Sequence, residues 1–195
     1  MPVRKEIPEK DGVYFLTFTC TNWLPLFHLS NSYHAVYKWF DYLKAQGHYI
    51  IGYVVMPNHV HALIAFKNTG KSINTIVANG KRFMAYDIVK RLEEGKKILV
   101  LNELQKRLNN TERKEGKKYG MFEPSFDWKE CRTVKFIEQK LDYMHWNPCK
   151  GNAFVKLPEE YVHSSACFYI LHKQGVYPVT SFMELEGIDL TSGVR

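Results

Sequence analysis

The sequence contains few of the features that mark metal-binding folds rich in cysteine, secreted proteins or membrane proteins. Its cysteines, Cys20, Cys131, Cys149 and Cys167, lie far apart without a C-x-x-C pair, which excludes a zinc knuckle and gives no support to a compact disulfide framework. No H-E-x-x-H motif is present, so a zinc hydrolase lacks its usual signature. No apolar run approaches membrane-spanning length, and the N-terminal MPVRKEIPEKDG is too polar for a signal peptide. We therefore expect a soluble, intracellular protein with reduced thiols.

Low-complexity tracts are also missing, and 45% hydrophobic with 24% charged residues is typical of a globular protein. A chain of 195 residues predicts a single domain over residues 1–195, with a charged insertion at about 93–120 and a C-terminal extension at about 167–195. The net charge of +7 and the pI of about 9.1 favour a polyanionic partner. Lysines that simply solvate the surface explain the charge equally well, so other features must decide.

Hydrophobic periodicity predicts an α+β fold. Strands are expected over 13–20, 48–56 and 59–66, helices over 30–46, 72–92, 99–108 and 133–146, and an edge strand or extended loop over 122–131. Pro57 and Asn58 alone separate two of the strands, which demands a tight hairpin. The order resembles the ferredoxin-like β-α-β-β-α-β antiparallel sheet. We expect the two early helices on one sheet face and the 133–146 helix on the other.

His59 and His61 stand two residues apart on a predicted strand, so both imidazoles project from the same face and can share one cation. On its own, an H-x-H pattern on a strand is more often structural than metal-binding. Val60, Ala62 and Ile64 form the opposite face, which we assign to the early helices. The 133–146 helix is then expected to cover the histidine face.

Tyr143 lies about 160° around that helix from Leu141, away from the apolar stripe of Val134, Ile137 and Leu141. Asn147 follows one turn later and points to the same side, so the phenol and the amide can meet one metal-bound phosphate. Two simpler interpretations remain. Tyr143 fits an amphipathic side chain at a helix edge, and by spacing alone Asn147 before Pro148 is better explained as a helix stop.

The segments MPNHVHALI, YMHWNPCKG and HSSA, together with the basic second helix, resemble the REP-associated tyrosine transposases and the wider single-tyrosine HUH transposases. The resemblance covers roughly residues 13–166, and M-P-N-H-x-H followed by Y-x-x-x-N-P is a specific pattern. It implies metal ligands at His59, His61 and Asn147 and a nucleophile at Tyr143. Relatives typically carry valine and arginine where this chain has Cys149 and Lys150, so Lys150 keeps a charge but lacks a bidentate fork.

The resemblance implies a transposase that cleaves and rejoins single-stranded DNA, at hairpins or palindromic repeats, through a 5′-phosphotyrosine. Its cofactor would be Mg²⁺ or Mn²⁺, and imidazole ligands suit Mn²⁺ better. We expect a monomer or homodimer in the bacterial cytoplasm, associated with the nucleoid through DNA. The alternative is a non-catalytic, domesticated DNA-binding protein on the same fold.

DNA contacts are expected from basic side chains that track the backbone and from aromatic side chains that stack on exposed bases. The nucleic-acid-binding residues that we predict are Lys81, Arg82, Lys140, Lys150, Trp128 and Trp146, with Trp23, Phe122 and Phe126 as further stacking candidates. Most aromatic side chains of a globular protein belong to its core. The stretch 93–120 matches the family poorly, so the loops that select the DNA sequence are not defined by the resemblance.

Overall fold

The computed structural model of this chain describes residues 11–108, 113–114 and 116–185. Four antiparallel strands form its sheet: β1 (Gly12–Thr19), β2 (Tyr49–Val55), β3 (His59–Phe66) and β4 (Asp127–Glu130). Their spatial order is β2-β3-β1-β4, and residues 56–58 make the tight β2–β3 connection. The predicted α+β class and the predicted hairpin are confirmed.

Four helices lie close to the ranges that periodicity predicts, and two short helices, Leu26–Leu29 and Ala166–Leu171, were not predicted. The helices are α1 (Leu26–Leu29), α2 (Tyr33–Ala45), α3 (Ile73–Glu94), α4 (Ile98–Lys106), α6 (Val134–His145) and α7 (Ala166–Leu171), with 3-10 turns η1 (Thr21–Trp23), η2 (Asn147–Cys149), η3 (Pro158–Glu160) and η4 (Phe182–Glu184). Side chains fix two of the helix starts, because the hydroxyls of Ser72 and Thr133 accept backbone N–H groups of the first turns of α3 and α6. Within 122–131, predicted as an edge strand or an extended loop, β4 is the part that pairs regularly with β1.

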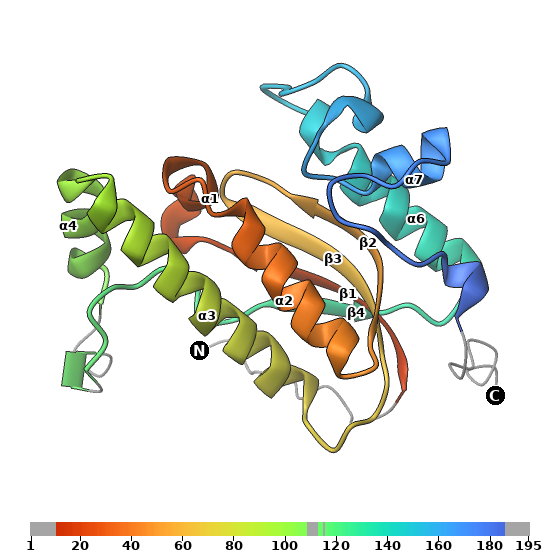
Figure 1. Cartoon of the computed structure of the whole chain (residues 1–195), viewed down its shortest axis with the longest axis horizontal. Helices are drawn as coiled ribbons and strands as arrows, with labels where there is room; N and C mark the ends of the chain where they lie inside the picture. The colour runs from red at the N-terminus through yellow and green to blue at the C-terminus, as the bar shows by residue number, and fades with distance from the viewer. Residues whose placement is uncertain (1–10, 109–112, 115, 186–195) are drawn as a thin grey trace.

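Helices α2 and α3 lie side by side across one face of the sheet (Figure 1). Val60, Ala62 and Ile64 of β3 are buried in the core that these helices close, as alternation along the strand predicts. A Cβ atom on Gly80 of α3 would lie 2.5 Å from the Trp39 indole of α2, so glycine permits the close approach of the two helices. This layer leaves the opposite face of β3 to a different element.

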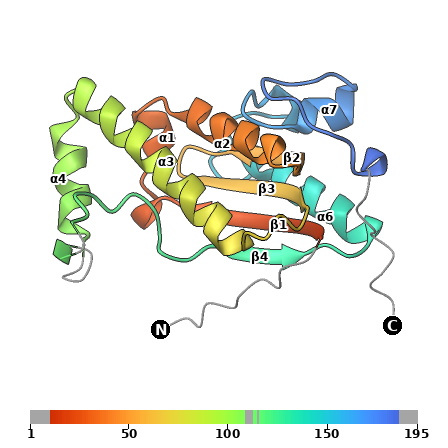
Figure 2. The ribbon, with the colours of Figure 1, turned by 60° about the horizontal axis from the view of Figure 1, so that its bottom comes forward.

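Helix α6 covers that opposite face, where it contacts β2 and β3 (Figure 2). Ile137 and Leu141 pack with Leu63 in a second apolar cluster, as expected. Val134 was predicted in the same stripe, but it is exposed. Gly52 of β2 allows the contact, since a Cβ there would approach Leu141 Cδ2 to 2.6 Å.

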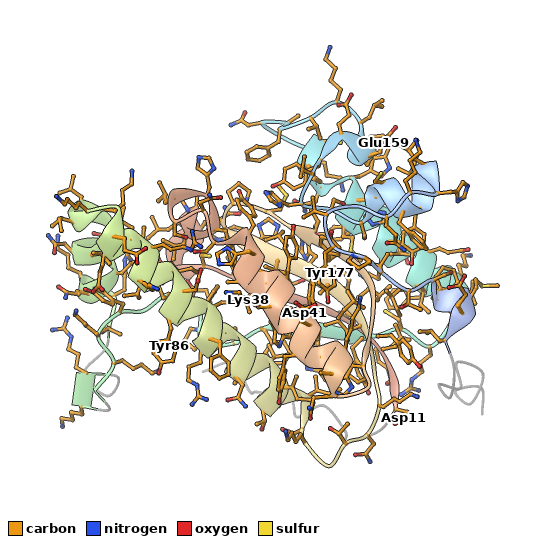
Figure 3. All side chains as sticks on the ribbon, viewed as in Figure 1. Asp11, Lys38, Asp41, Tyr86, Glu159 and Tyr177 are labelled. Atoms are coloured by element: carbon orange, nitrogen blue, oxygen red, sulfur yellow. The ribbon has the colours of Figure 1, made fainter. Side chains whose placement is uncertain are left out.

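The outer edge of β2 is paired with the segment that follows η3. Ser164 forms a β-bridge with Val54, Val55 N–H donates to the His163 carbonyl at 2.8 Å, and Ser165 N–H donates to the Tyr53 carbonyl at 3.0 Å. Further along, the Tyr177 hydroxyl donates to Asp41 of α2 at 2.9 Å, and Figure 3 shows these two side chains close together. The C-terminal part of the described chain is thereby fastened to the sheet.

Some predicted segments lie outside the described residues. These are the polar N-terminus up to residue 10, residues 109–112 and 115 of the charged loop, and the C-terminal extension beyond residue 185.

None of the helices within the described ranges combines the length and the apolarity that a membrane crossing needs.

Candidate active site

Strand β3 places His59 and His61 on the sheet face that α6 covers. Their strand partners on β1 are Thr19 and Thr17, and the two imidazole centroids lie 4.8 Å apart. The residues are 8% and 5% exposed, so water reaches them poorly. Burial lowers the pKa of His59 to about 4, against a hydrogen bond with Asn147 that raises it. Burial lowers the pKa of His61 to about 3, and the nearby His59, Lys140 and Lys150 act in the same direction. Both rings are therefore neutral at physiological pH, the form that binds a metal ion.

Both histidines use Nδ1 for a hydrogen bond within the protein. His59 Nδ1 lies 2.7 Å from Asn58 Oδ1, and His61 Nδ1 lies 2.7 Å from Thr17 Oγ1. The Asn58 amide orientation is fixed because its Nδ2 donates to the Trp23 carbonyl at 3.2 Å. With Nδ1 protonated on each ring, the lone pair of each neutral imidazole resides on Nε2. Metal-ligating histidines have this arrangement, in which an outer partner selects the tautomer.

Asn147 approaches the histidines from the end of α6. The helix ends at His145, Trp146 caps it, and Asn147 starts the turn η2. Its Nδ2 lies 3.4 Å from His61 Nε2, which accepts from it. Rotating the amide by half a turn would present its oxygen to the same point. The helix-stop role and the proximity to the histidines therefore coexist in one residue.

Tyr143 also lies beside the histidines. Its ring centroid is 5.4 Å from that of His61 and 6.0 Å from that of Phe15, both in edge-to-face geometry. Tyr143 is 45% exposed, so the described chain buries only about half of it. Since α6 packs on the sheet of its own chain, the tyrosine and both histidines meet within one protomer.

Two ammonium groups flank the tyrosine. Lys140 Nζ lies 5.6 Å and Lys150 Nζ 5.0 Å from the centroid of the Tyr143 ring. Lys140 also lies 5.0 Å from the Phe15 ring, which in turn stacks on His61 at 5.3 Å. Phenol, imidazoles and cations are thus packed around Phe15, and the positive charge gathers where an anionic group would contact the tyrosine.

His145 is the one histidine of α6, and it faces away from this cluster. Its Nε2 lies 2.8 Å from Ser165 Oγ, which also bonds the backbone of Tyr53 on β2. Burial lowers the pKa of His145 to about 4. His145 therefore holds α6 against β2 in its neutral form.

The structure does not bring every predicted DNA-binding residue to the histidines. Lys81 and Arg82 belong to α3, on the other face of the sheet, and Lys81 Nζ donates to the carbonyls of Glu123, Pro124 and Ser125 at 2.6–3.4 Å. Trp128 is half-buried against Tyr14 on that same face. Trp146 is exposed at the end of α6, next to Asn147.

Two further stacking candidates pack against the core on the α2–α3 face. Phe122 lies edge-to-face with Phe18, and Phe126 is partly buried against the same cluster.

Sequence reasoning missed the residues that orient the histidines. Thr17 is identified by the β1–β3 register alone, which no local pattern reveals. Asn58 precedes His59 directly, and asparagine at that position was the one available signal. Phe15 carried no signal beyond its place in an apolar strand.

Two neutral imidazoles with their Nδ1 atoms engaged and one side-chain amide are donor types that can bind a divalent cation. Among the described residues, no group of three or more His, Cys, Asp and Glu side chains is arranged to hold a metal. The candidate site thus depends on Asn147 for its third ligand.

Comparisons with known proteins gave one kind of match. No family model and no curated protein matches the chain. Among solved structures, the chain is similar to a REP-associated tyrosine transposase determined bound to a REP hairpin, with a TM-score of 0.52 and 19% sequence identity over 83% of this chain and 79% of that chain. At that identity, the likeness shows that the two proteins share a fold.

Proposed function

We propose that this protein is a DNA strand-transfer enzyme in which Tyr143 attacks a phosphodiester of single-stranded DNA held against His59, His61 and Asn147. The main support for this proposal is that two oriented imidazoles, an amide and a half-exposed phenol meet in one chain, and that two ammonium groups flank the phenol. The likeness to a transposase solved with a hairpin supports the same proposal, and with it a ferredoxin-like arrangement of the sheet.

A divalent ion would be held by the Nε2 atoms of His59 and His61 and by the amide oxygen of Asn147. When bound, Mg²⁺ or Mn²⁺ supplies positive charge that polarises a phosphodiester. Thr17 and Asn58 keep the imidazole lone pairs directed inward, so the ligands need little reorganisation on binding. Helix α6 carries Tyr143, and the turn η2 directly after it carries Asn147, which fixes the phenol relative to the ligands.

In the proposed step, Tyr143 Oη attacks the phosphorus and the P–O3′ bond breaks. The products are a 5′-phosphotyrosine and a strand with a free 3′-hydroxyl, while the phenol loses its proton and the departing 3′ oxygen gains one. A tyrosine hydroxyl in water is a poor nucleophile at neutral pH. Lys140 and Lys150 beside the ring favour negative charge on the phenol and the phosphate as attack proceeds. A new 3′-hydroxyl can reverse the step, which makes the reaction a strand transfer without a nucleotide cofactor.

The test is trapping of the covalent adduct. The protein is incubated with Mn²⁺ and a hairpin oligonucleotide with single-stranded flanks, labelled downstream of the cut, and separated by denaturing electrophoresis. We expect a labelled protein band that Tyr143→Phe abolishes. Tyr86→Phe is the matched control, because Tyr86 is exposed on α3, on the other sheet face (Figure 3).

Two results would contradict the proposal. Adduct formation by Tyr143→Phe would exclude this residue as the nucleophile. Tight DNA binding by the unaltered protein without any adduct, across hairpins of varied flanks, would instead favour a non-catalytic DNA-binding protein.

A further inference from the structure

The turn between β1 and α1 holds two successive residues in an unfavourable backbone conformation. Asn22 has φ 49° and Trp23 has φ 58°, both in the left-handed region that side chains with a Cβ rarely adopt. A tryptophan in this region is rarer than an asparagine, since a bulky side chain gains nothing there from a local hydrogen bond. Such strain persists only where surrounding contacts enforce it, and it gathers at functional sites.

Contacts from distant parts of the chain enforce this turn. The Asn22 N–H donates to Glu123 Oε1 at 3.0 Å. With the Asn22 amide turned so that its oxygen faces Arg107, at the end of α4, the guanidinium donates to that oxygen. The Trp23 N–H donates to the Cys20 carbonyl at 3.1 Å. The turn is thus clamped from α4, from the segment before β4 and from the end of β1.

The turn exposes the Trp23 indole and places it against a candidate metal ligand. Trp23 is 63% exposed, the largest exposed fraction among the four tryptophans. Its ring centroid lies 5.6 Å from that of His59 at an interplanar angle of 72°. At that exposed fraction, most of the Trp23 surface remains open. Burial of a side chain therefore does not explain why the backbone is strained to position it.

Asn58 links this indole to the candidate site. One amide accepts from His59 Nδ1 at 2.7 Å and donates to the Trp23 carbonyl at 3.2 Å. The turn and the ligand are thereby held as one unit. The centroids of the Trp23 and His59 rings are 5.6 Å apart, which is less than two base-stacking steps of about 3.4 Å each. A base stacked on Trp23 would therefore lie next to a phosphate held at His59.

We propose that Trp23 is a stacking platform for the unpaired nucleobase next to the phosphate held at His59 and His61. The assignment rests on the proposed function for the position of that phosphate. An indole face binds any base by stacking, but only when the base is free of a neighbour on that side. A continuous duplex cannot offer such a base, so the platform would select single-stranded DNA at the reaction centre.

The first measurement needs no catalysis. In the Tyr143→Phe background, 2-aminopurine is moved base by base along the single-stranded flank of a hairpin oligonucleotide, and its fluorescence is recorded on binding. We expect strong quenching at one position, lost in Trp23→Ala and largely kept in Trp23→Phe. Loss of one stacked base should weaken binding roughly 5- to 150-fold. Phe83→Ala is the control, since Phe83 is a comparably exposed ring on α3.

The second measurement separates stacking from damage to the site. An abasic nucleotide at the quenched position should weaken binding of the Trp23-containing protein as much as Trp23→Ala does, and the two changes together should add nothing. Mn²⁺ affinity without DNA should be the same with and without Trp23→Ala. The stacking proposal would be wrong if the losses of affinity from the abasic nucleotide and from Trp23→Ala were fully additive, or if no single flank position showed quenching.

The two proposals fail in different ways. If the unaltered protein forms the adduct but Trp23→Ala leaves DNA affinity and the KM for nicking unchanged, the platform is wrong and the proposed function stands. If no adduct ever forms but one flank base is quenched through Trp23, the proposed function is wrong and the stacking site stands.

Discussion

The hydrogen bond between Thr17 and His61 allows the candidate metal site to be tested through a residue that does not touch the ion. Thr17→Val keeps the β-branched shape and removes the hydroxyl 2.7 Å from His61 Nδ1. A bound ion requires the lone pair on Nε2 and hence a proton on Nδ1, which the variant leaves without a partner in a residue that is 5% exposed. An unsatisfied buried donor costs about 1–3 kcal/mol. The metal-free imidazole escapes this cost by changing tautomer, so the penalty falls on the bound state.

That cost corresponds to an Mn²⁺ affinity roughly 5- to 150-fold weaker, which brackets the roughly 10- to 100-fold loss typical when a ligating histidine loses its outer partner. Isothermal titration calorimetry with Mn²⁺ measures it, and thermal melting establishes that the variant is folded. Thr19→Val is the matched control: Thr19 is the strand partner of His59, and its hydroxyl makes no hydrogen bond within the described ranges. Equal Mn²⁺ affinity for Thr17→Val and the unaltered protein would refute the reasoning, as would an equal loss in Thr19→Val.

Three further predictions concern packing, pH and salt. Gly52→Ala should lower the free energy of unfolding by about 1–3 kcal/mol, because its Cβ would meet the Leu141 side chain, and denaturant melts of Gly52→Ala with Leu141→Ala should show partial compensation; simple additivity would argue against the clash. Burial lowers the pKa of His163, so the unfolded state binds more protons below about pH 6.5 and stability falls as the pH falls through that value; thermal melts of His163→Gln should show a shallower pH dependence, and an unchanged slope would contradict this. Lys140→Gln and Lys150→Gln should each reduce the slope of log affinity against log salt for single-stranded DNA by about 0.7, and an unchanged slope would remove that lysine from the DNA path.

The parts of the fold that the sequence predicts well are those with local signals. The hairpin is defined by two strand-like runs on either side of Pro57 and Asn58, and α3 by its apolar period and its Ser72 cap. The face of β3 that carries His59 and His61 follows from the two-residue period of a strand. Each of these features depends on residues that are neighbours in the chain, so it can be predicted from a single sequence.

Contacts between residues far apart in the chain explain where the structure differs from the sequence-based predictions. Lys81 lies on a basic face of α3, yet its ammonium is engaged by carbonyls some 42 to 44 residues away. The role of Thr17 depends on a strand register with a partner 44 residues away. The exposure of Trp23 depends on a turn that Arg107 and Glu123 clamp. Periodicity carries no information about such contacts.

The pairing of residues 163–165 along β2 has a consequence for how these molecules behave when crowded. With that border of the sheet occupied by the same chain, β4 is the border left to an incoming strand among the described residues. It is only four residues long, DWKE, and three of them carry charge. Short, charged edge strands discourage edge-to-edge strand pairing between molecules. A concentrated solution of this protein should therefore resist fibrillar aggregation through its sheet.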